Sequence, residues 1–401
     1  MKKFLKSLDK KQIRLIIIIT VISLIMRVLW LPGKSGDYLG FLKPWVEDIR
    51  ELGYFKALKY NIGNYNVPYI ILLVFVSFIK GEPLVPIKIL SIIFDFICAI
   101  YGAKIVNKLT NNKWSTVITY LIIICLPTVL VNGAMWAQCD SIYTSFILMS
   151  LYYLINKKYT KSFLLLGVSF AFKLQFIFIL PLYVLLLFRE KEVKLYHFLL
   201  IPLVNIVLCL PAIIAGRGFM DVISIYFSQV DYYLDLVLNF PNLYNLIQSN
   251  GNFFLANYDI VAKVGVVVTL GIFACIWLYT LLKKVKFYPE KILLVGIWSV
   301  VICTYFLPRM HDRYMFVADV LSVIWFMAYQ KKFYMVIVIN VISLFTYFRF
   351  LFHLEFIGVN ILSIIYFIVI MIFTIYVIKE LGENNEVERV KVGRKKLRRV
   401  S

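Results

Sequence analysis

Residues 292–329 read ILLVGIWSVVICTYF-LPRMHDRY-MFVADVLSVIWFMAY, two apolar runs joined by a short charged turn. Each run approaches the ~20 residues that a helix needs to cross a bilayer, so the pattern predicts two membrane helices. The turn carries Arg309, His311 and Arg313, and arginine offers a fixed fork of donors that matches phosphate oxygens. We therefore expect an anion clamp here. The alternative is a headgroup anchor, since arginines at helix ends often reach lipid phosphates.

The composition places the whole chain in the membrane class. Of its 401 residues, 62% are hydrophobic and 16% are charged, against about 25% charged in soluble domains. The net charge of +21 would suit a nucleic-acid partner. However, the basic residues stand in short loops and at both ends, where they orient a protein in the membrane. We therefore predict an all-α polytopic membrane protein that contacts lipids and binds no nucleic acid.

Several other classes find no support in the sequence. The first apolar run, residues 13–31, is long and no small-residue cleavage site follows it, so we expect a membrane span rather than a cleaved signal peptide. Five of the six cysteines lie inside apolar runs and none forms a Cys-x-x-Cys pair, which favours small apolar side chains over disulfides or metal ligands. Metal-ligand spacing, a phosphate-binding loop and a dinucleotide glycine pattern are all missing from the sequence.

Positive charge decides the expected topology. Every loop that we assign to the cytoplasm is basic, and the positive-inside rule then gives about twelve spans with both termini inside. We expect one transmembrane domain over residues 1–388 and a basic cytoplasmic tail over residues 389–401. Two long loops, residues 33–86 and 216–257, are expected outside.

The first external loop is expected to lie on the membrane surface. Apolar positions recur at helical spacing between Phe41 and Leu58, with charged residues between them, which is typical of an amphipathic interfacial helix. Residues 69–79 are apolar but short for a span. We interpret them as a second interfacial helix, with a short span as the alternative.

Polar residues gather at the expected outer face. They include Asp37 after the first span, Gln138 and Asp140 at a later outer helix end, and Lys173 between two apolar runs. Alternatively, Asp37 and Asp140 cap the helices that follow them, since Asp is a favoured N-cap, and Trp136 belongs to an interfacial aromatic belt. Lys173 is harder to explain as a structural residue, because an unpaired ammonium between apolar runs is costly.

A few charged residues fall inside the predicted spans. We interpret Asp95 as a partner of Lys88, two turns away on the same helix, and Asp319 as a further internal partner. Arg27 stands about one turn from the outer end of the first span, so we expect it to reach the headgroups or an acid in the following loop.

Five short motifs occur in order along most of the chain. They are Gly36-Asp37-Tyr38, Trp136-Ala137-Gln138-Cys139-Asp140, Phe172-Lys173-Leu174-Gln175, Pro241-Asn242-Leu243-Tyr244-Asn245 and Arg309-Met310-His311-Asp312-Arg313-Tyr314. In this order they resemble the GT-C superfamily of integral-membrane glycosyltransferases. Within it, the chain is similar to the bacterial proteins related to the eukaryotic GPI mannosyltransferase II. The resemblance implies a GT-C-like bundle of transmembrane helices.

The resemblance also implies a reaction at the outer membrane face. A sugar, with mannose as one candidate, would pass from a polyprenyl-phosphate donor to a hydroxyl of a glycan, glycolipid or glycoprotein, with inversion at the anomeric carbon. Asp37 matches the general base of the family. The donor phosphate would fall to Arg309, His311, Arg313 and Lys173. The remaining motif residues are expected to bind substrate, namely Trp136, Gln138, Asp140, Gln175, Asn242, Tyr244, Asn245 and Tyr314.

The Asp-x-Asp metal motif of some relatives is absent, since Ser35 stands two residues before Asp37. We therefore expect no metal, and no cofactor beyond the lipid-linked sugar as co-substrate. Two other classes of function remain as alternatives. A polyprenyl-lipid or small-solute transporter or flippase would usually show repeated halves with broken helices near the midplane, and we find no repeated half. A non-catalytic lipid-binding membrane scaffold would tolerate the loss of Asp37.

Overall fold

The computed structural model describes residues 7–226, 235–247 and 257–383. The predicted basic tail, residues 389–401, lies outside the described residues, as do parts of the second long loop. In the described parts, the regular secondary structure is helical apart from one pair of two-residue strands, β1 (Val237–Leu238) and β2 (Met310–His311). The predicted all-α class is confirmed.

Seven of the described helices are long and apolar enough to cross a membrane, as expected for a multi-pass membrane protein. They are α2 (Lys10–Trp30), α5 (Leu84–Thr110), α11 (Leu195–Ile214), α16 (Tyr258–Leu282), α17 (Pro289–Phe306), α19 (Phe333–Phe352) and α20 (Val359–Gly382). An eighth crossing is available to α6 (Lys113–Cys125) with α7 (Pro127–Leu130) and η3 (Val131–Met135), which pass the same test together but bend by 48°. The bend falls at Pro127, which interrupts the helical hydrogen bonds.

The remaining helices are shorter and connect or support these long ones. They are η1 (Tyr38–Leu42), α3 (Lys43–Glu51), η2 (Tyr54–Lys59), α4 (Val67–Ser77), α8 (Asp140–Ile155), α9 (Tyr159–Phe172), η4 (Leu174–Ile179), α10 (Leu180–Arg189), α12 (Phe219–Ile223), α14 (Leu243–Ile247) and α18 (Phe316–Tyr329).

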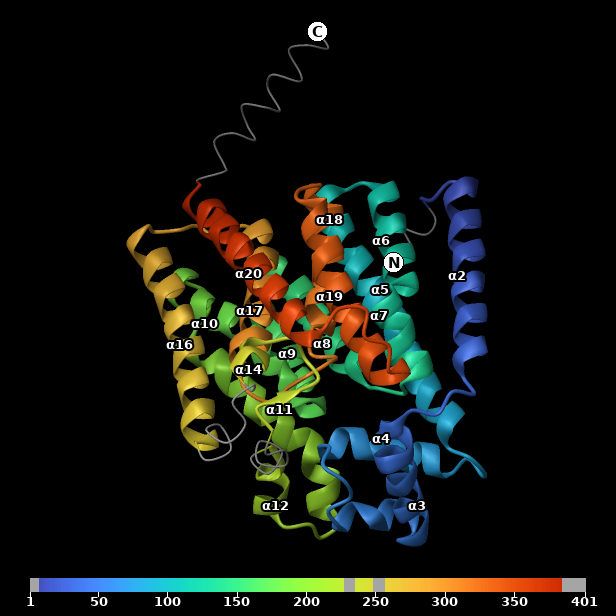
Figure 1. Ribbon diagram of the computed structural model, residues 1–401. Coiled ribbons are helices and arrows are strands. Elements are labelled where there is room, and N and C mark those ends of the chain that lie inside the picture. Colours follow the sequence, from blue (N-terminus) through green and yellow to red (C-terminus); the bar gives the residue numbers. More distant parts are fainter. Residues whose placement is uncertain (1–6, 227–234, 248–256, 384–401) are drawn as a thin grey trace.

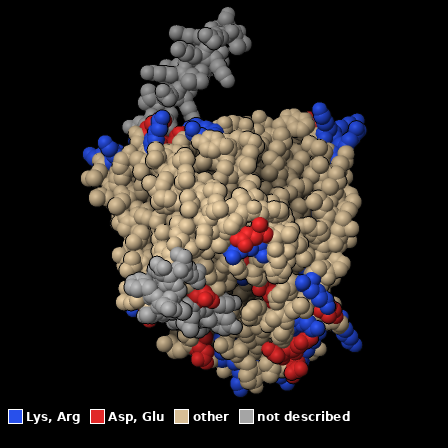
Figure 2. Space-filling model, in the orientation of Figure 1, with Lys and Arg blue, Asp and Glu red and all other residues tan. Residues whose placement is uncertain are grey.

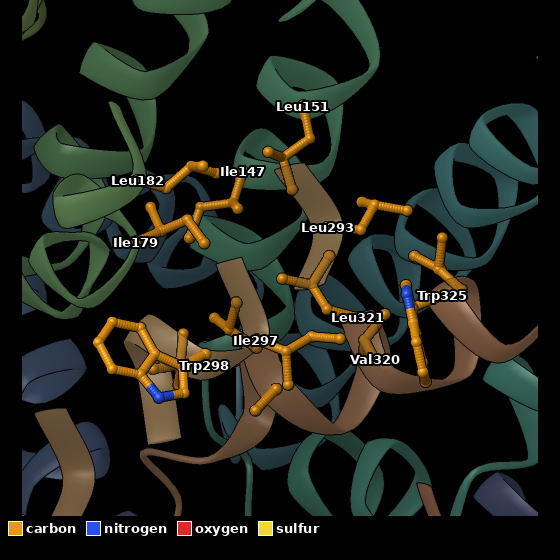
Figure 3. Packing of buried hydrophobic residues seen from close by; sticks show 14 of the residues in the cluster. Ile147, Leu151, Ile179, Leu182, Leu293, Ile297, Trp298, Val320, Leu321 and Trp325 are labelled. Carbon is orange, nitrogen blue, oxygen red and sulfur yellow. The ribbon is translucent and has the colours of Figure 1, made fainter. Parts of the chain in front are cut away.

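The two apolar runs on either side of the charged turn form the centre of the molecule as α17 and α18. Both helices are apolar on nearly all sides and bury almost every side chain, as expected for helices without a polar face. Figure 3 shows Ile297 of α17 in one cluster with Leu321 of α18 and Ile179 of η4. Gly296 permits this packing, because a Cβ there would lie 3.1 Å from Ile179 Cδ1.

Helix α2 lies at the edge of the bundle (Figure 1) and exposes apolar side chains such as Ile17 and Leu29. Its buried residues are the polar Gln12, Ser23 and Arg27. Exposed apolar and buried polar residues are expected where lipid, rather than water, surrounds a helix. In Figure 2, Lys, Arg, Asp and Glu lie toward the two ends of the face shown and in one patch near its centre, and the surface around that patch is largely uncharged.

The first long loop, residues 33–86, forms several short helices rather than one. The helix expected between Phe41 and Leu58 is divided into η1, α3 and η2. The chain changes direction between α3 and η2 at Gly53, whose φ is 87°. Glycine adopts this left-handed conformation without a steric penalty. Helix α3 then buries Trp45 and Ile49 and packs against α4. Figure 1 shows α3, α4 and α12 together at one end of the bundle.

The charges buried within the long helices pair differently from the prediction. Arg27 of α2 lies 3.1 Å from Asp95 of α5, and the two side chains are 1% and 0% exposed. Lys88, the predicted partner of Asp95, donates instead to three main-chain carbonyls at the end of α2. Both the Lys88–Asp95 pair and the expected loop partner of Arg27 are therefore wrong. Spacing along α5 cannot reveal which charge the neighbouring α2 brings to it.

Candidate functional site

Asp37 lies between the end of α2 and η1, and its carboxylate turns away from the helix that it precedes. It occupies the N-cap position of η1 but makes no capping hydrogen bond. Its Oδ2 accepts hydrogen bonds from Trp136 Nε1 at 2.9 Å and from Gln138 Nε2 at 2.5 Å. The side chain is 19% exposed. The capping alternative therefore does not account for Asp37, which is held by another segment and still reaches the surface.

Arg313 connects Asp37 to a second carboxylate. Its Nη1 lies 3.4 Å from Asp37 Oδ2, and its Nε lies 3.7 Å from Asp140 Oδ2. The guanidinium also lies over the ring of Trp136, 5.3 Å from its centroid. Trp136 is fully buried, so it is not a residue of an interfacial belt. The Arg313 side chain is 11% exposed, and the headgroup-anchor alternative does not apply to it.

Asp140 is a fully enclosed carboxylate. It accepts hydrogen bonds from Lys173 Nζ at 2.5 Å and from Asn132 Nδ2 at 2.8 Å. Lys173 lies 5.7 Å from the ring centroids of both Tyr65 and Tyr143. The ammonium between two apolar runs thus has a carboxylate partner, as its cost in an apolar setting requires. We call the group Asp37, Trp136, Gln138, Asp140, Lys173 and Arg313 the Asp37 cluster.

Two further titratable groups of the turn are shifted by burial. Burial raises the pKa of Asp312 to about 7, although the neighbouring Arg313 opposes the shift. Burial also lowers the pKa of His311 well below its ordinary value, and the charges of Arg313 and Lys173 add to the effect. His311 is therefore neutral near pH 7, and it would meet a phosphate through a hydrogen bond rather than as a cation.

Arg309 turns toward a different helix from Arg313. Its φ is 63°, and its Nε donates to Tyr258 Oη at the start of α16. The guanidinium lies 5.2 Å from the centroid of that ring. The main-chain N–H of Arg309 donates to Leu236 O at 2.8 Å, beside the parallel pair of β1 and β2. The structure thus brings Arg313 to Asp37 and directs Arg309 to α16.

The Pro-Asn-Leu-Tyr-Asn motif supports the same turn. Tyr244 of α14 donates its hydroxyl to Phe306 O at 2.7 Å, at the last residue of α17. Asn242 Oδ1 accepts the Tyr244 N–H, and Asn245 Nδ2 donates to Phe240 O. These contacts are with the main chain, so they fix the loop and the end of α17. The predicted substrate contacts of Asn242, Tyr244 and Asn245 stay a prediction.

Gln175 and Tyr314 lie near Lys173 in the structure. Tyr314 packs against Phe178 of η4 and against His311, with ring centroids 5.6 Å and 5.1 Å apart. Gln175 Oε1 is buried without a hydrogen-bond partner among the described residues. A buried polar atom that is left unsatisfied often marks the place of a water molecule or ligand. The predicted substrate roles of Gln175 and Tyr314 stay predictions.

Helix α5 positions both segments that meet at Asp37. Lys88 Nζ donates to Gly33 O at 2.6 Å, just before Asp37, and Ser91 Oγ donates to Gln138 O at 2.6 Å. Ser35 Oγ joins the two segments directly through Trp136 O at 2.7 Å. The sequence pattern did not predict these supporting residues. One indication of the role of Lys88 was present in the sequence, because a lysine inside an apolar run needs a polar partner.

A surface groove of about 640 Å³ begins beside Asp37. Its lining comes from the segment before Asp37, from η3, from the loop after β1 and from the end of α19, namely Lys34, Ser35, Gly36, Met135, Asn239, Arg349, Phe350, Leu351, His353 and Glu355. Phe350 stacks on Trp136 with ring centroids 4.8 Å apart, so the groove and the Asp37 cluster share a wall. The sequence pattern did not predict this groove either, although Arg349 is an isolated charge in an apolar run.

Within the described ranges, no group of three or more His, Cys, Asp or Glu side chains is arranged to hold a metal ion. No protein-family model matches the chain, and no curated protein matches its sequence.

Proposed function

We propose that the chain is a GT-C-type membrane glycosyltransferase, which moves a sugar from a polyprenyl-phosphate donor to a hydroxyl of a glycan, glycolipid or glycoprotein. The observation that carries the proposal is the Asp37 carboxylate, which two N–H donors orient and which remains 19% exposed. A general base must be fixed in place and must also reach its substrate, because a proton is transferred only over hydrogen-bond distance.

In the proposed reaction, Asp37 accepts the proton of the acceptor hydroxyl. Trp136 and Gln138 both donate to Oδ2, so Oδ1 takes the proton. The hydroxyl oxygen forms a bond to the anomeric carbon while the bond from that carbon to the phosphate oxygen breaks. Polyprenyl phosphate leaves with the electron pair, and attack from the opposite face inverts the anomeric carbon.

Arg313 stands 3.4 Å from Asp37 Oδ2 as a fixed positive charge. Fixed cations stabilise negative charge that develops during a reaction, because they need no reorganisation when it appears. In the proposal, Arg313 acts with Arg309, His311 and Lys173 near the donor phosphate. Arg313 and Lys173 also lie within ion-pair distance of Asp37 and Asp140. A phosphate would therefore meet these two cations already partly neutralised.

The proposed topology has about twelve crossings, with both termini in the cytoplasm and Asp37 outside. The shorter apolar helices would supply the crossings beyond the seven long ones. Single cysteines at the exposed positions Lys56 and Lys158 test this arrangement, in a chain whose exposed Cys275 is replaced by Ser. On intact cells an impermeant maleimide should label Lys56→Cys and not Lys158→Cys. The reverse pattern would contradict the topology.

The reaction is tested with the purified chain in liposomes. Radiolabelled polyprenyl-phosphate hexoses and acceptors extracted from the producing cells should yield labelled acceptor and free polyprenyl phosphate in equal amounts. Mass spectrometry of surface glycans from cells with and without the gene should show the same sugar missing. If no donor supports transfer and the surface glycans do not change, the proposed function is wrong.

A further inference from the structure

We propose that Asp319 and the oxygen atoms around it bind a sodium ion between α7, α18 and α19. These three helices pack against one another in the interior of the bundle. The ion supports the fold and takes no part in the proposed transfer reaction. Its binding can therefore be measured on the folded protein alone, whatever reaction the protein catalyses.

Asp319 is a buried carboxylate without a cationic side chain beside it. It lies in the first turn of α18, and its side chain is 0% exposed. Its expected internal partner is a hydroxyl rather than a charge, since Ser343 Oγ of α19 donates to Oδ2 at 2.7 Å. Among the described residues, no Lys, Arg or His forms an ion pair with Asp319. A buried charge without a partner is costly, so this carboxylate needs either a proton or a cation.

Neutral oxygens gather around the same carboxylate. The Thr128 hydroxyl of α7 lies beside it. Asn340 of α19 is close as well, because its Nδ2 donates to Ser322 Oγ at 3.2 Å and Ser322 Oγ donates to Asp319 O at 2.9 Å. Asp319 Oδ1, Thr128 Oγ1 and Asn340 Oδ1 are all buried and have no hydrogen-bond partner within the described parts of the chain. Buried oxygens left unsatisfied in one place are typical of a site that takes up an ion or water.

This set of oxygens favours a metal ion over a proton. A protonated carboxyl group donates one hydrogen bond, whereas an ion can contact several oxygens at once. Carboxylate, hydroxyl and amide oxygens suit hard cations rather than the metals that prefer imidazole or thiolate.

The charge and the packing of the site favour sodium among the hard cations. One carboxylate balances one monovalent ion, and a divalent ion would leave a net positive charge in the apolar interior, which is costly. The side chains of Asp319 and Ser343 are 0% exposed and that of Thr128 is 1% exposed. Such close packing leaves room for a small ion, which favours Na⁺ over the larger K⁺.

The proposed sodium site is joined to the charged turn by hydrogen bonds. Thr346 Oγ1 lies 2.6 Å from Asp312 O and 2.6 Å from Ser343 O. Ser343 in turn donates to Asp319. An ion at Asp319 would therefore hold α18 against α19 next to the turn that carries Arg313.

Thermal unfolding of the purified full-length protein in detergent tests the inference. A ligand that binds only the folded state raises the unfolding midpoint as its concentration increases. From about 1 mM to about 100 mM Na⁺, at constant ionic strength set with choline chloride, we expect a rise of a few degrees. K⁺ in place of Na⁺ should give a clearly smaller rise.

Variants of the proposed ligands locate the effect. Asp319→Asn keeps the size of the side chain but removes its charge, so the midpoint should no longer depend on Na⁺. Ser343→Ala should raise the Na⁺ concentration needed for half of the rise by roughly tenfold, as expected for the loss of one supporting group. The matched control is Ser363→Ala. Ser363 is a buried serine of α20 that donates to Val359 O of its own helix, and its variant should respond to Na⁺ as the unchanged protein does.

Three results would overturn the inference. Equal midpoints in Na⁺ and in choline would show that Asp319 holds a proton and needs no metal ion. Equal rises with Na⁺ and K⁺ would remove the assignment to sodium. A full Na⁺ response in both Asp319→Asn and Ser343→Ala would place the ion elsewhere. If Asp319→Asn does not fold, the response of Ser343→Ala compared with Ser363→Ala decides the question.

Discussion

Two arginine–aspartate pairs in this molecule have similar distances and opposite surroundings. Arg27, in the last turn of α2, and Asp95 of α5 are 3.1 Å apart, and Arg313 and Asp37 are 3.4 Å apart at the charged turn. The first pair is at most 1% exposed, and Arg27 Nη1 also donates to Ile124 O. In the second pair, Asp37 is 19% exposed beside an open groove.

The difference separates a structural pair from a candidate reactive one. Arg27 and Asp95 satisfy each other where no substrate can enter, so their role is to hold α2 against α5. Asp37 is held by three groups on one oxygen and keeps a path to the surface. An ion pair becomes a candidate site when one member is fixed and still accessible.

Asp37→Asn gives the largest expected effect on activity. Asn keeps the size of the side chain but cannot accept the proton, and general-base catalysis typically contributes 10²–10⁴-fold in rate. We expect transfer from the lipid-linked donor to fall by about that factor, while the thermal unfolding midpoint stays nearly unchanged. Glu47→Gln, in the same loop, is the control and should keep full activity. Near-normal transfer by Asp37→Asn, with loss in Asp140→Asn, would move the base to Asp140.

Arg27→Met tests the other member of the comparison. Removing one partner of a buried ion pair typically costs about 3–5 kcal/mol, because the other charge is left unpaired. The Asp95 side chain is 0% exposed. Arg27→Met leaves its charge unpaired, and we expect the free energy of unfolding to fall by about this amount. The double variant Arg27→Met/Asp95→Leu should recover most of the stability. Thermal unfolding in detergent measures both, and an unstable double variant would show that the pair does more than neutralise itself.

Arg313→Lys is expected to have a smaller effect on transfer activity, because it changes only the contacts of Arg313 with Asp37 and Asp140. A lysine keeps the charge but cannot reach Asp37 and Asp140 together through separate nitrogens, as the guanidinium does. Transfer should fall by roughly tenfold, the equivalent of one hydrogen bond to a charged group. The same change at Arg309, which contacts Tyr258, should cost less. Equal losses at both positions would contradict the distinction that we draw between the two arginines.

Asp312→Asn should give the smallest effect, visible only as a change in pH dependence. Burial raises the pKa of Asp312 from 3.8 to about 7 in the folded protein. Between these values the folded state keeps a proton that the unfolded state has released, so this group lowers the free energy of unfolding as pH rises. The amide cannot ionise, and we expect thermal unfolding midpoints to fall less between pH 5 and pH 7.5 than in the unchanged protein. Asp48→Asn, at an exposed position, is the control. If the unfolding midpoint of Asp312→Asn changes with pH as much as that of Asp48→Asn, Asp312 is ionised throughout this range.

The polar motifs show how far the sequence alone could predict the site. Trp136, Gln138 and Asp140 are close in sequence, so their joint appearance at one helix end was readable. The topology predicts that they share one face with Asp37 and Arg313, but the hydrogen bonds of Trp136 and Gln138 to Asp37 and the approach of Arg313 to Asp140 come only from the structure. Arg309 stood in the same motif as Arg313, yet a backbone φ of 63° and Tyr258 direct it to α16. Neighbours in sequence can diverge because an irregular turn has no fixed periodicity.

The sequence by itself determined that this chain is helical and belongs to the membrane, because long apolar runs can satisfy their backbone hydrogen bonds in lipid only as helices. It did not determine which helix would lie at the centre, because α17 is buried along almost its whole length while the more apolar α2 is largely exposed. Only the tertiary structure decided which charges pair across helices, that Arg27 rather than Lys88 reaches Asp95, and that Lys34 and Arg349 line one groove. Such contacts depend on how whole helices approach one another. Periodicity along a single helix shows which side chains share a face, but not what that face meets.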